Sequence, residues 1–277
     1  MNWAELLWGV LFVVLLLDLR RISGRLRSMA RLRPDEAEDD SSLCWVTAPG
    51  VILDEETRLS ALAHMKVRGL VGLELIPAKL PLSMAWSMGC HIDPEAHRAD
   101  STRPGDTGLH AFVVPASALE GFGVDQAGAD LASFLTLARE VRRRIDGPHD
   151  IVISPTLKAQ ASNPFFDSSA LEVKLGGSVA PVAFGIPVAT TLMLVGPLFA
   201  PWMGSLALLV HLLQQPLSLR QTGFQVRLPW LQGLLRPIVD LSQWLFLIRG
   251  KSVSRDQIDG LRPVYDELMS SGTSAFF

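Results

Sequence analysis

The stretch Val179–Leu219, VAPVAFGIPVATTLMLVGPLFAPWMGSLALLVHLLQQPLSL, decides the expected fold, because His211 is its only ionisable side chain. A bilayer core accepts about 20 apolar residues per helix, so this run is long enough for two crossings. Pro197 and Pro201 near its middle favour a turn between two helices. Residues 178–219 are therefore predicted to form a transmembrane helical hairpin. A buried hairpin in a soluble protein is the alternative.

The composition supports an integral membrane protein with one polar domain. The chain has 277 residues, of which 48% are hydrophobic and only 19% charged, and the excess of apolar residues lies in 3–17, 179–219 and 228–248. Basic and acidic residues number 25 and 28, so the overall charge gives no reason to expect nucleic acid as a partner. Cys44 and Cys90 do not suggest a disulfide framework.

Residues 1–20 are predicted to form an N-terminal transmembrane anchor, and residues 21–42 a charged linker. Arginines from Arg20 and Arg21 onward follow the apolar run directly, which by the positive-inside rule keeps this flank in the cytoplasm and the N-terminus outside. We therefore expect a multi-pass protein of the inner (cytoplasmic) membrane with its main domain in the cytoplasm. A peripheral amphipathic helix at the N-terminus is the alternative.

Residues 43–177 have the pattern of an α/β domain, because predicted strands alternate with predicted helices. The strands are expected at Leu43–Thr47, Leu70–Ile76, Leu109–Val114 and Asp150–Ser154, and the helices at 55–67 and 126–145. Asp54 is the predicted N-cap of the first helix, and Gly69 ends it. Between the second and third strands the chain is expected to be irregular.

The residues Cys90, His91 and His97 are candidate metal ligands, because their side chains are of the types that bind transition metals. Their spacing matches no familiar zinc motif, and Pro94 interrupts the segment. A polar surface loop is therefore the favoured interpretation. The chain also lacks GxGxxG and GxxxxGK[ST], so no nucleotide cofactor is predicted.

Three stretches resemble membrane-bound family 2 glycosyltransferases of the ceramide glucosyltransferase and hopanoid-pathway type. They are Leu43–Leu75, Phe112–Val141, and His149–Lys158 followed by the hairpin and by LLRPIVDLSQWLFLIRG at 234–250. The resemblance implies a partial glycosyltransferase A-like domain. It also implies a sugar nucleotide, a divalent cation and a lipid acceptor as the ligands of an active member.

The chain departs from that family at the positions that carry catalysis. Ala48-Pro49-Gly50 stands where the family has its metal-binding DxD, and Ser133-Phe134 stands where it has its catalytic Glu-Asp pair. Neither replacement can bind the cation or take a proton from an acceptor hydroxyl. In another register Asp125 or Asp130 is the candidate base. The resemblance therefore indicates a shortened scaffold that has lost catalysis.

Residues 228–249 are predicted to form an interfacial amphipathic helix, followed by a polar tail at 250–277. A third crossing is the alternative. Tryptophans suit the headgroup region, and arginines reach lipid phosphates. The candidate residues for a lipid interface are Arg20, Arg21, Arg227, Trp230, Arg236, Trp244 and Arg249.

These features together predict a non-catalytic structural or accessory subunit of a membrane complex, with a degenerate glycosyltransferase-like domain. Its expected partners are membrane lipids and membrane-protein subunits, without nucleic acid. An active lipid-directed glycosyltransferase that uses a sugar nucleotide is the alternative function. A lipid-binding module is the second alternative.

Overall fold

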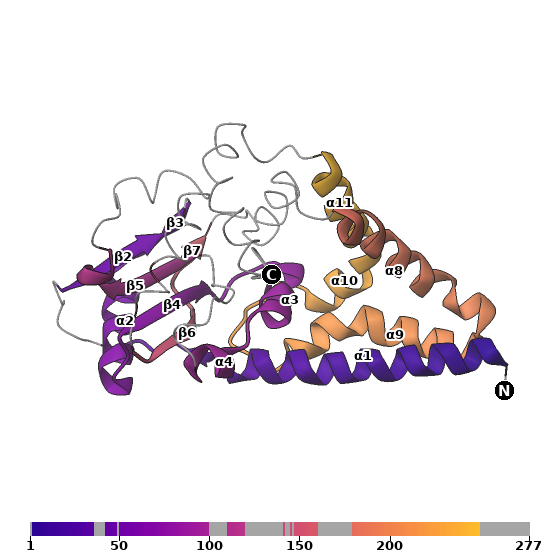
Figure 1. Ribbon diagram of the computed structural model, residues 1–277, viewed down its shortest axis with the longest axis horizontal. Helices are drawn as coiled ribbons and strands as arrows, with labels where there is room; N and C mark the ends of the chain where they lie inside the picture. Colours follow the sequence, from indigo (N-terminus) through magenta and orange to yellow (C-terminus); the bar gives the residue numbers. More distant parts are fainter. Residues whose placement is uncertain are drawn as a thin grey trace.

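The computed structural model comprises a sheet domain and a group of helices that extends from it (Figure 1). The described residues are 2–35, 42–48, 50–99, 110–119, 141, 145, 147–159 and 179–249. Helix α1, Trp3–Ser28, runs along the base of both parts.

The main sheet has five strands in the order β1-β6-β4-β5-β2. Strands β1, β6 and β4 are parallel to one another, whereas β5 is antiparallel to both of its neighbours. The strands are β1 (Ala30–Arg31), β2 (Leu43–Thr47), β4 (Gly72–Pro77), β5 (Ala111–Pro115) and β6 (His149–Ser154). A second, two-stranded antiparallel sheet pairs β3 (Val51–Ile52) with β7 (Lys158–Ala159).

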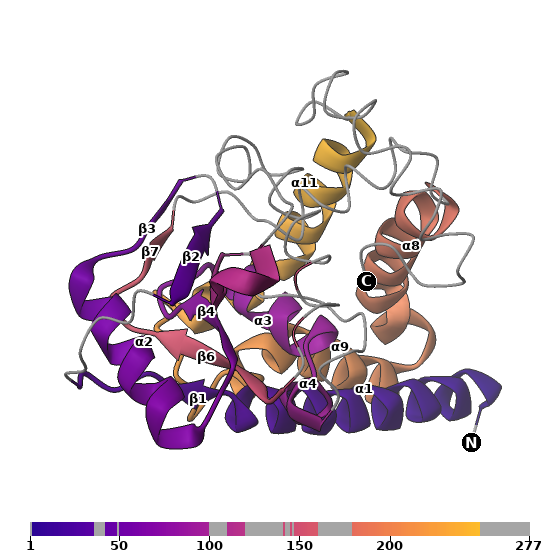
Figure 2. The same ribbon diagram turned by 60° about the vertical axis from the view of Figure 1, so that its left-hand side comes forward.

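Helices cover both faces of the main sheet, and the side chains of each strand alternate between them. In β6, Val152 points to the face covered by α2, Glu55–Arg68, whereas Ile151 and Ile153 point to the face covered by the end of α1 and by α3, Leu82–His91. Figure 2 shows α2 and α3 on opposite sides of the strands. A sheet buried on both faces explains why its strands are almost wholly apolar.

Helix α2 begins and ends as its sequence predicts. The Asp54 carboxylate accepts a hydrogen bond from the Thr57 N–H at 2.9 Å, which satisfies a backbone donor that the first turn leaves free. Gly69 at the other end has φ of 63°, in the left-handed region that glycine adopts without strain. These caps fix the length of α2 and so the position of its last turn.

The group of helices is built around the contact of α1 with a hairpin of two helices. Gly196 in the hairpin leaves room for the Trp8 ring of α1, because a Cβ atom there would lie 2.6 Å from a Trp8 ring carbon. The Glu5 carboxylate accepts hydrogen bonds from the N–H groups of Trp202 and Met203 at 3.4 and 3.0 Å. The hairpin and the helices after it are α8 (Val179–Phe199), α9 (Pro201–Ser218), α10 (Pro229–Leu234) and α11 (Arg236–Arg249).

The predicted transmembrane segments are wrong. Within the residues that the structure describes, no helix is both long enough and apolar enough to span a membrane. In α1 the apolar residues end at Leu17, so they cover about 22 Å at 1.5 Å per residue, less than the roughly 30 Å of a bilayer core. In α9 the last two turns bury the polar side chains of His211, Gln214 and Gln215. The predicted anchor at 1–20 and the multi-pass location in a cytoplasmic membrane are corrected accordingly.

The predicted strands of the sheet domain are confirmed with shifts of one or two residues at their ends. The segment after β4, expected to be irregular, instead forms α3 and the short α4, Pro94–Ala99. Its Met84 and Met88 are fully buried in the main core, a role that the periodicity of so short a helix does not reveal. The helix predicted at 126–145 lies outside the described residues apart from Val141 and Ile145, which join that core.

The helix predicted at 228–249 is present as two helices. Helix α10 ends at Leu234 with Leu235 as its C-cap, and Pro237 follows within the first turn of α11. Proline lacks the N–H that a continuous helix needs at this point. The Gln232 side chain of α10 also accepts a hydrogen bond from the Leu82 N–H at 2.8 Å, which joins α10 to the start of α3. The break therefore lets α10 attach to the sheet domain.

Replacing Gly204 with alanine is expected to disrupt the hairpin, because the new Cβ atom would overlap the carbonyl group of Gly196. We expect Gly204→Ala to lower the free energy of unfolding by about 1–3 kcal/mol. Gly24→Ala in α1 is the matched control, because nothing lies within 4 Å of its added Cβ. That control is expected to be neutral or to stabilise by up to about 1 kcal/mol. Denaturant unfolding followed by circular dichroism measures both, and equal effects would contradict the prediction.

Candidate functional site

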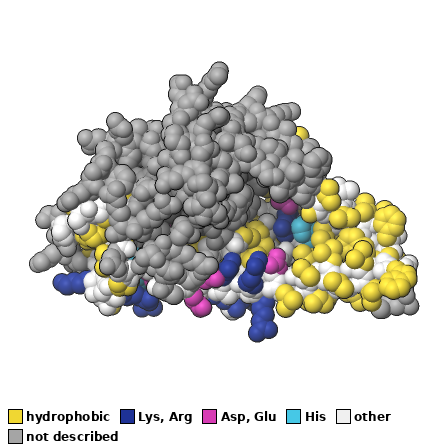
Figure 3. Space-filling model, in the orientation of Figure 1, with side chains coloured by type: hydrophobic (Ala, Val, Ile, Leu, Met, Phe, Trp, Pro, Cys, Tyr) yellow, Lys and Arg dark blue, Asp and Glu magenta, His cyan; other side chains and the backbone are white. Residues whose placement is uncertain are grey.

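The most extensive surface feature is apolar and lies on the helices, and we call it the apolar helical surface. Figure 3 shows hydrophobic side chains gathered over the end of the molecule formed by α1, α8 and α9. Trp3, Leu198 and Trp202 are 85%, 80% and 79% exposed. The other large members on α1, α8, α9 and α10 are Leu6, Leu7, Val10, Val13, Val14, Leu16, Leu17, Val188, Leu192, Leu194, Phe199, Leu206, Leu209, Trp230, Leu231 and Leu234. Soluble monomers rarely expose so extended an apolar surface, which marks it as a binding surface.

The apolar helical surface excludes charge along most of its length. Glu5, the one acidic residue within 3–17, is turned to the start of α9, where it caps two N–H groups. Basic residues begin only where the apolar residues of α1 end, with Arg20 and Arg21 exposed. Arg21 forms an ion pair with Asp18 at 2.8 Å. The surface therefore has an apolar body and a basic margin.

The predicted lipid-facing residues divide into two groups in the structure. Arg20, Arg21, Arg227 and Trp230 are exposed, as a lipid contact requires. Arg236 is turned inward, with only 13% of its side chain exposed. The side chains of Trp244 and Arg249 lie outside what the structure describes.

Arg236 is held by polar groups of neighbouring helices. Its Nη1 donates hydrogen bonds to the His211 carbonyl oxygen at 2.7 Å and to Gln214 Oε1 at 3.3 Å, and its Nε lies 3.4 Å from the Asp240 carboxylate. The guanidinium also stacks 5.7 Å from the centre of the Trp86 ring. Burial, reinforced by the charge of Arg236, lowers the pKa of His211 to about 4, so this imidazole is neutral at pH 7. Arg236 therefore joins α9, α11 and α3.

The candidate metal and catalytic residues are not brought together by the described structure. Burial, with a smaller effect of the Asp18 carboxylate, raises the pKa of the Cys90 thiol to about 11, and a protonated thiol is a poor metal ligand. Among the described residues, no three His, Cys, Asp or Glu side chains could hold a metal ion. The side chains of His91 and His97 lie outside the description, as do Ser133, Phe134, Asp125 and Asp130 in full.

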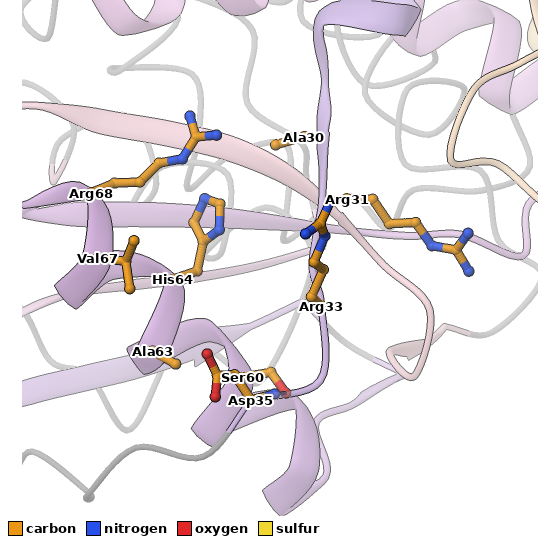
Figure 4. A pocket seen from close by; sticks show the side chains of 9 residues that line it. All are labelled: Ala30, Arg31, Arg33, Asp35, Ser60, Ala63, His64, Val67 and Arg68. Atoms are coloured by element: carbon orange, nitrogen blue, oxygen red, sulfur yellow. Dashed lines mark hydrogen bonds between the residues drawn. The ribbon is translucent and has the colours of Figure 1, made fainter.

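A second feature is a pocket of about 480 Å³ between β1 and α2, and we call it the basic pocket. Arg31 and Arg33 line it from β1 and the residues after it, and His64 and Arg68 line it from the last turns of α2. Figure 4 shows His64 and Arg68 of α2 on one side and Arg33 across from them, with Arg31 directed away from the two α2 residues. Among the described residues, neither Arg31 nor Arg33 forms an ion pair.

The buried carboxylate of Asp150 lies near the α2 residues of the basic pocket. Its Oδ1 accepts hydrogen bonds from Arg98 Nε at 2.6 Å and from the Ile151 N–H at 2.8 Å. Its Oδ2 lies 3.7 Å from Arg68 Nη1 and 3.9 Å from His64 Nε2. Burial by itself would raise the pKa of Asp150, but these neighbours together lower it below its ordinary value.

The sequence contains the residues of the basic pocket but gives no sign that they meet. Arg31 and Arg33 read as part of a basic flank, and His64 and Arg68 as an exposed edge of an amphipathic helix. They converge because β1 pairs with β6, more than a hundred residues further along the chain. The helical spacing of His64 and Arg68 is the one local signal that could have linked two of them.

Comparison with protein-family models, with curated proteins and with solved structures finds no match to this chain. The resemblance to family 2 glycosyltransferases therefore stays a prediction.

Asp150→Asn is expected to destabilise the sheet domain, because it removes the buried negative charge that forms an ion pair with Arg98. We expect the free energy of unfolding at pH 7 to fall by about 2 kcal/mol. The folded pKa of Asp150 is lowered, so its contribution is complete above the ordinary value of 3.8 and is lost as the pH falls through the folded value.

Denaturant unfolding at pH 7 and at several acidic pH values measures this contribution. The difference between wild type and Asp150→Asn should shrink below pH 3.8. Glu56→Gln removes an exposed carboxylate from α2 and should change stability by less than about 0.5 kcal/mol. If the stability difference between wild type and Asp150→Asn stays unchanged down to the lowest pH, the lowered pKa assigned to Asp150 is contradicted.

Proposed function

We propose that the protein is a non-catalytic accessory protein that binds the surface of a lipid bilayer through the apolar helical surface, with none of the described helices crossing it. The observation that carries this proposal is the exposure of large apolar side chains on several neighbouring helices. Each such side chain contributes about 1.5–3 kcal/mol when it leaves water, so a few of them suffice for stable attachment. The sheet domain then lies beside the bilayer as a cap.

The arrangement of the apolar side chains favours lipid over a protein partner. Trp3 on α1, Leu198 on α8 and Trp202 on α9 are all more than three-quarters exposed, although they belong to three different helices. A folded partner covers one face of such a group, whereas lipid chains are fluid and adapt to every face. The exposed rings of Trp3, Trp202 and Trp230 also suit the boundary between acyl chains and headgroups.

The basic margin of the surface supports the same proposal. Arg20 and Arg21 are exposed immediately beyond Leu16 and Leu17, where the apolar face of α1 ends. Each basic residue close to an anionic bilayer contributes about 1 kcal/mol through attraction to lipid phosphates. We therefore expect tighter binding to anionic than to neutral lipid, and weaker binding at high salt.

The end of β2 supports a non-catalytic role. Thr47 ends the strand, and the buried Ala48 and the turn at Gly50 follow it. In the family that the sequence resembles, this position holds the carboxylates that bind the metal. A methyl group and a glycine hydrogen cannot replace them.

The test measures binding of the full chain to mixed phosphatidylcholine–phosphatidylglycerol vesicles by flotation. Wild type should float with the vesicles. Leu198→Glu places a charge on a side chain that is 80% exposed, and the partition coefficient should fall roughly tenfold or more. Ile52→Glu on β3 is the matched control, because Ile52 is 64% exposed but lies outside the apolar helical surface, and its binding should equal that of wild type.

Two outcomes would overturn the proposal. The first is wild-type protein that stays with the aqueous fraction. The second is sedimentation of the wild type as a defined oligomer that Leu198→Glu dissociates, which would show that the apolar helical surface binds a second copy of the chain.

A further inference from the structure

We propose that the basic pocket binds a small, soluble organic molecule through a phosphate group. This inference is independent of lipid binding, because none of the residues that carry it belongs to the apolar helical surface. Its observations are a cavity and an excess of positive charge among the described residues that line it.

Among the residues that the structure describes, the basic pocket has more positive than negative charge. Asp150 lies below it, but Arg98 holds the Oδ1 of that carboxylate at 2.6 Å. Arg68 lies 3.7 Å from Oδ2, yet half of its side chain remains exposed, so it keeps N–H groups for a ligand. Arg31 and Arg33 have no acidic partner among the described residues. Asp35 contributes one carboxylate to the rim, so the arginines are in excess among the described lining residues.

His64 lies at the inner side of the pocket, beside Asp150. Its Nε2 atom is buried and has no hydrogen-bond partner. It faces Asp150 Oδ2 at 3.9 Å, and that oxygen is likewise buried without a hydrogen-bond partner. Since this nitrogen is closed to solvent and lies beside a carboxylate, the contacts to an anion are assigned to Arg33 and Arg68.

The size and lining of the pocket identify the class of ligand. About 480 Å³ lies within the usual range for small-molecule sites and exceeds what a lone inorganic ion fills. Ala63 and Val67 of α2 give it one apolar wall, which suits an organic body attached to the anionic group. The guanidinium group of arginine donates two parallel hydrogen bonds to two oxygens of one phosphate. Several arginines together favour a phosphate over a singly charged carboxylate.

The position of the pocket favours a soluble ligand over a lipid headgroup. β1 follows the C-terminal end of α1, whereas Trp3 and Trp202 lie at the opposite end of that helix. A helix of 26 residues is about 39 Å long. The bilayer phosphates proposed at Arg20 and Arg21 lie about 12 Å before the end of α1, and Arg33 lies beyond that end, away from Trp3 and Trp202.

The test is calorimetric titration of the full chain with inorganic pyrophosphate at low ionic strength, with succinate titrated in parallel at matched ionic strength. Pyrophosphate should bind with one site per chain and more tightly than succinate. Arg33→Gln should weaken its binding at least tenfold. Arg20→Gln removes an exposed arginine of α1 that does not line the pocket, and it should leave the affinity within twofold of wild type. Circular dichroism confirms that the exposed substitutions leave the fold intact.

Several results would overturn the proposal. Absence of binding to wild type would do so, as would equal weakening by both arginine variants, which is the mark of unspecific attraction. Succinate binding as tight as that of pyrophosphate would contradict the phosphate assignment. Loss of vesicle flotation on Arg33→Gln would assign the pocket to lipid headgroups, and a single-stranded RNA that binds more tightly than pyrophosphate and competes with it would assign it to nucleic acid.

Discussion

The packing of α1 against the hairpin of α8 and α9 is the contact on which both parts of the structure depend. Trp8 enters the space left by Gly196, and Glu5 caps the start of α9. Further along, Ile22 and Leu26 of the same helix press against Gly89 of α3, where a Cβ atom would lie 2.6 Å from Leu26. Because those two residues also belong to the core of the sheet domain, α1 is a rigid connection between the hairpin and the sheet.

The same helix also sets the edge of the sheet. β1 begins one residue after the C-cap of α1, and Arg98 donates to the Ser28 carbonyl oxygen at 2.8 Å while it holds Asp150 of β6. The end of α1 is therefore fixed to the strand with which β1 pairs. Any displacement of α1 would move Arg33 relative to α2, so the geometry of the basic pocket depends on a helix that contributes none of its side chains.

The sequence predicted the elements that carry their own signals and missed those that depend on distant contacts. Asp54 and Gly69 determine α2, and runs of apolar residues determine the strands, so local chemistry sufficed there. The hydropathy of 179–219 identified two helices correctly but not their environment, because composition cannot show that Gln214 and Gln215 are turned inward. Arg236 was expected at a lipid surface, because the residues beside it in the sequence do not show that Trp86 and the His211 carbonyl group are its partners in the fold.

The apolar helical surface also depends on charged side chains of these helices, such as Arg236 and Glu5, that are directed toward neighbouring helices and away from the outer surface. Burying a charge is costly unless it is paired, and Arg236 is paired with Asp240 and with the backbone of α9. Glu5 follows the same rule, since its charge is used to cap a helix. In a helix bundle surrounded by water these groups would gain by facing outward, with apolar side chains between the helices. Here they lie inward beside an apolar contact that includes Trp8, Met193 and Ala207, so the described outer faces of α1 and α9 present no unpaired charge before Arg20.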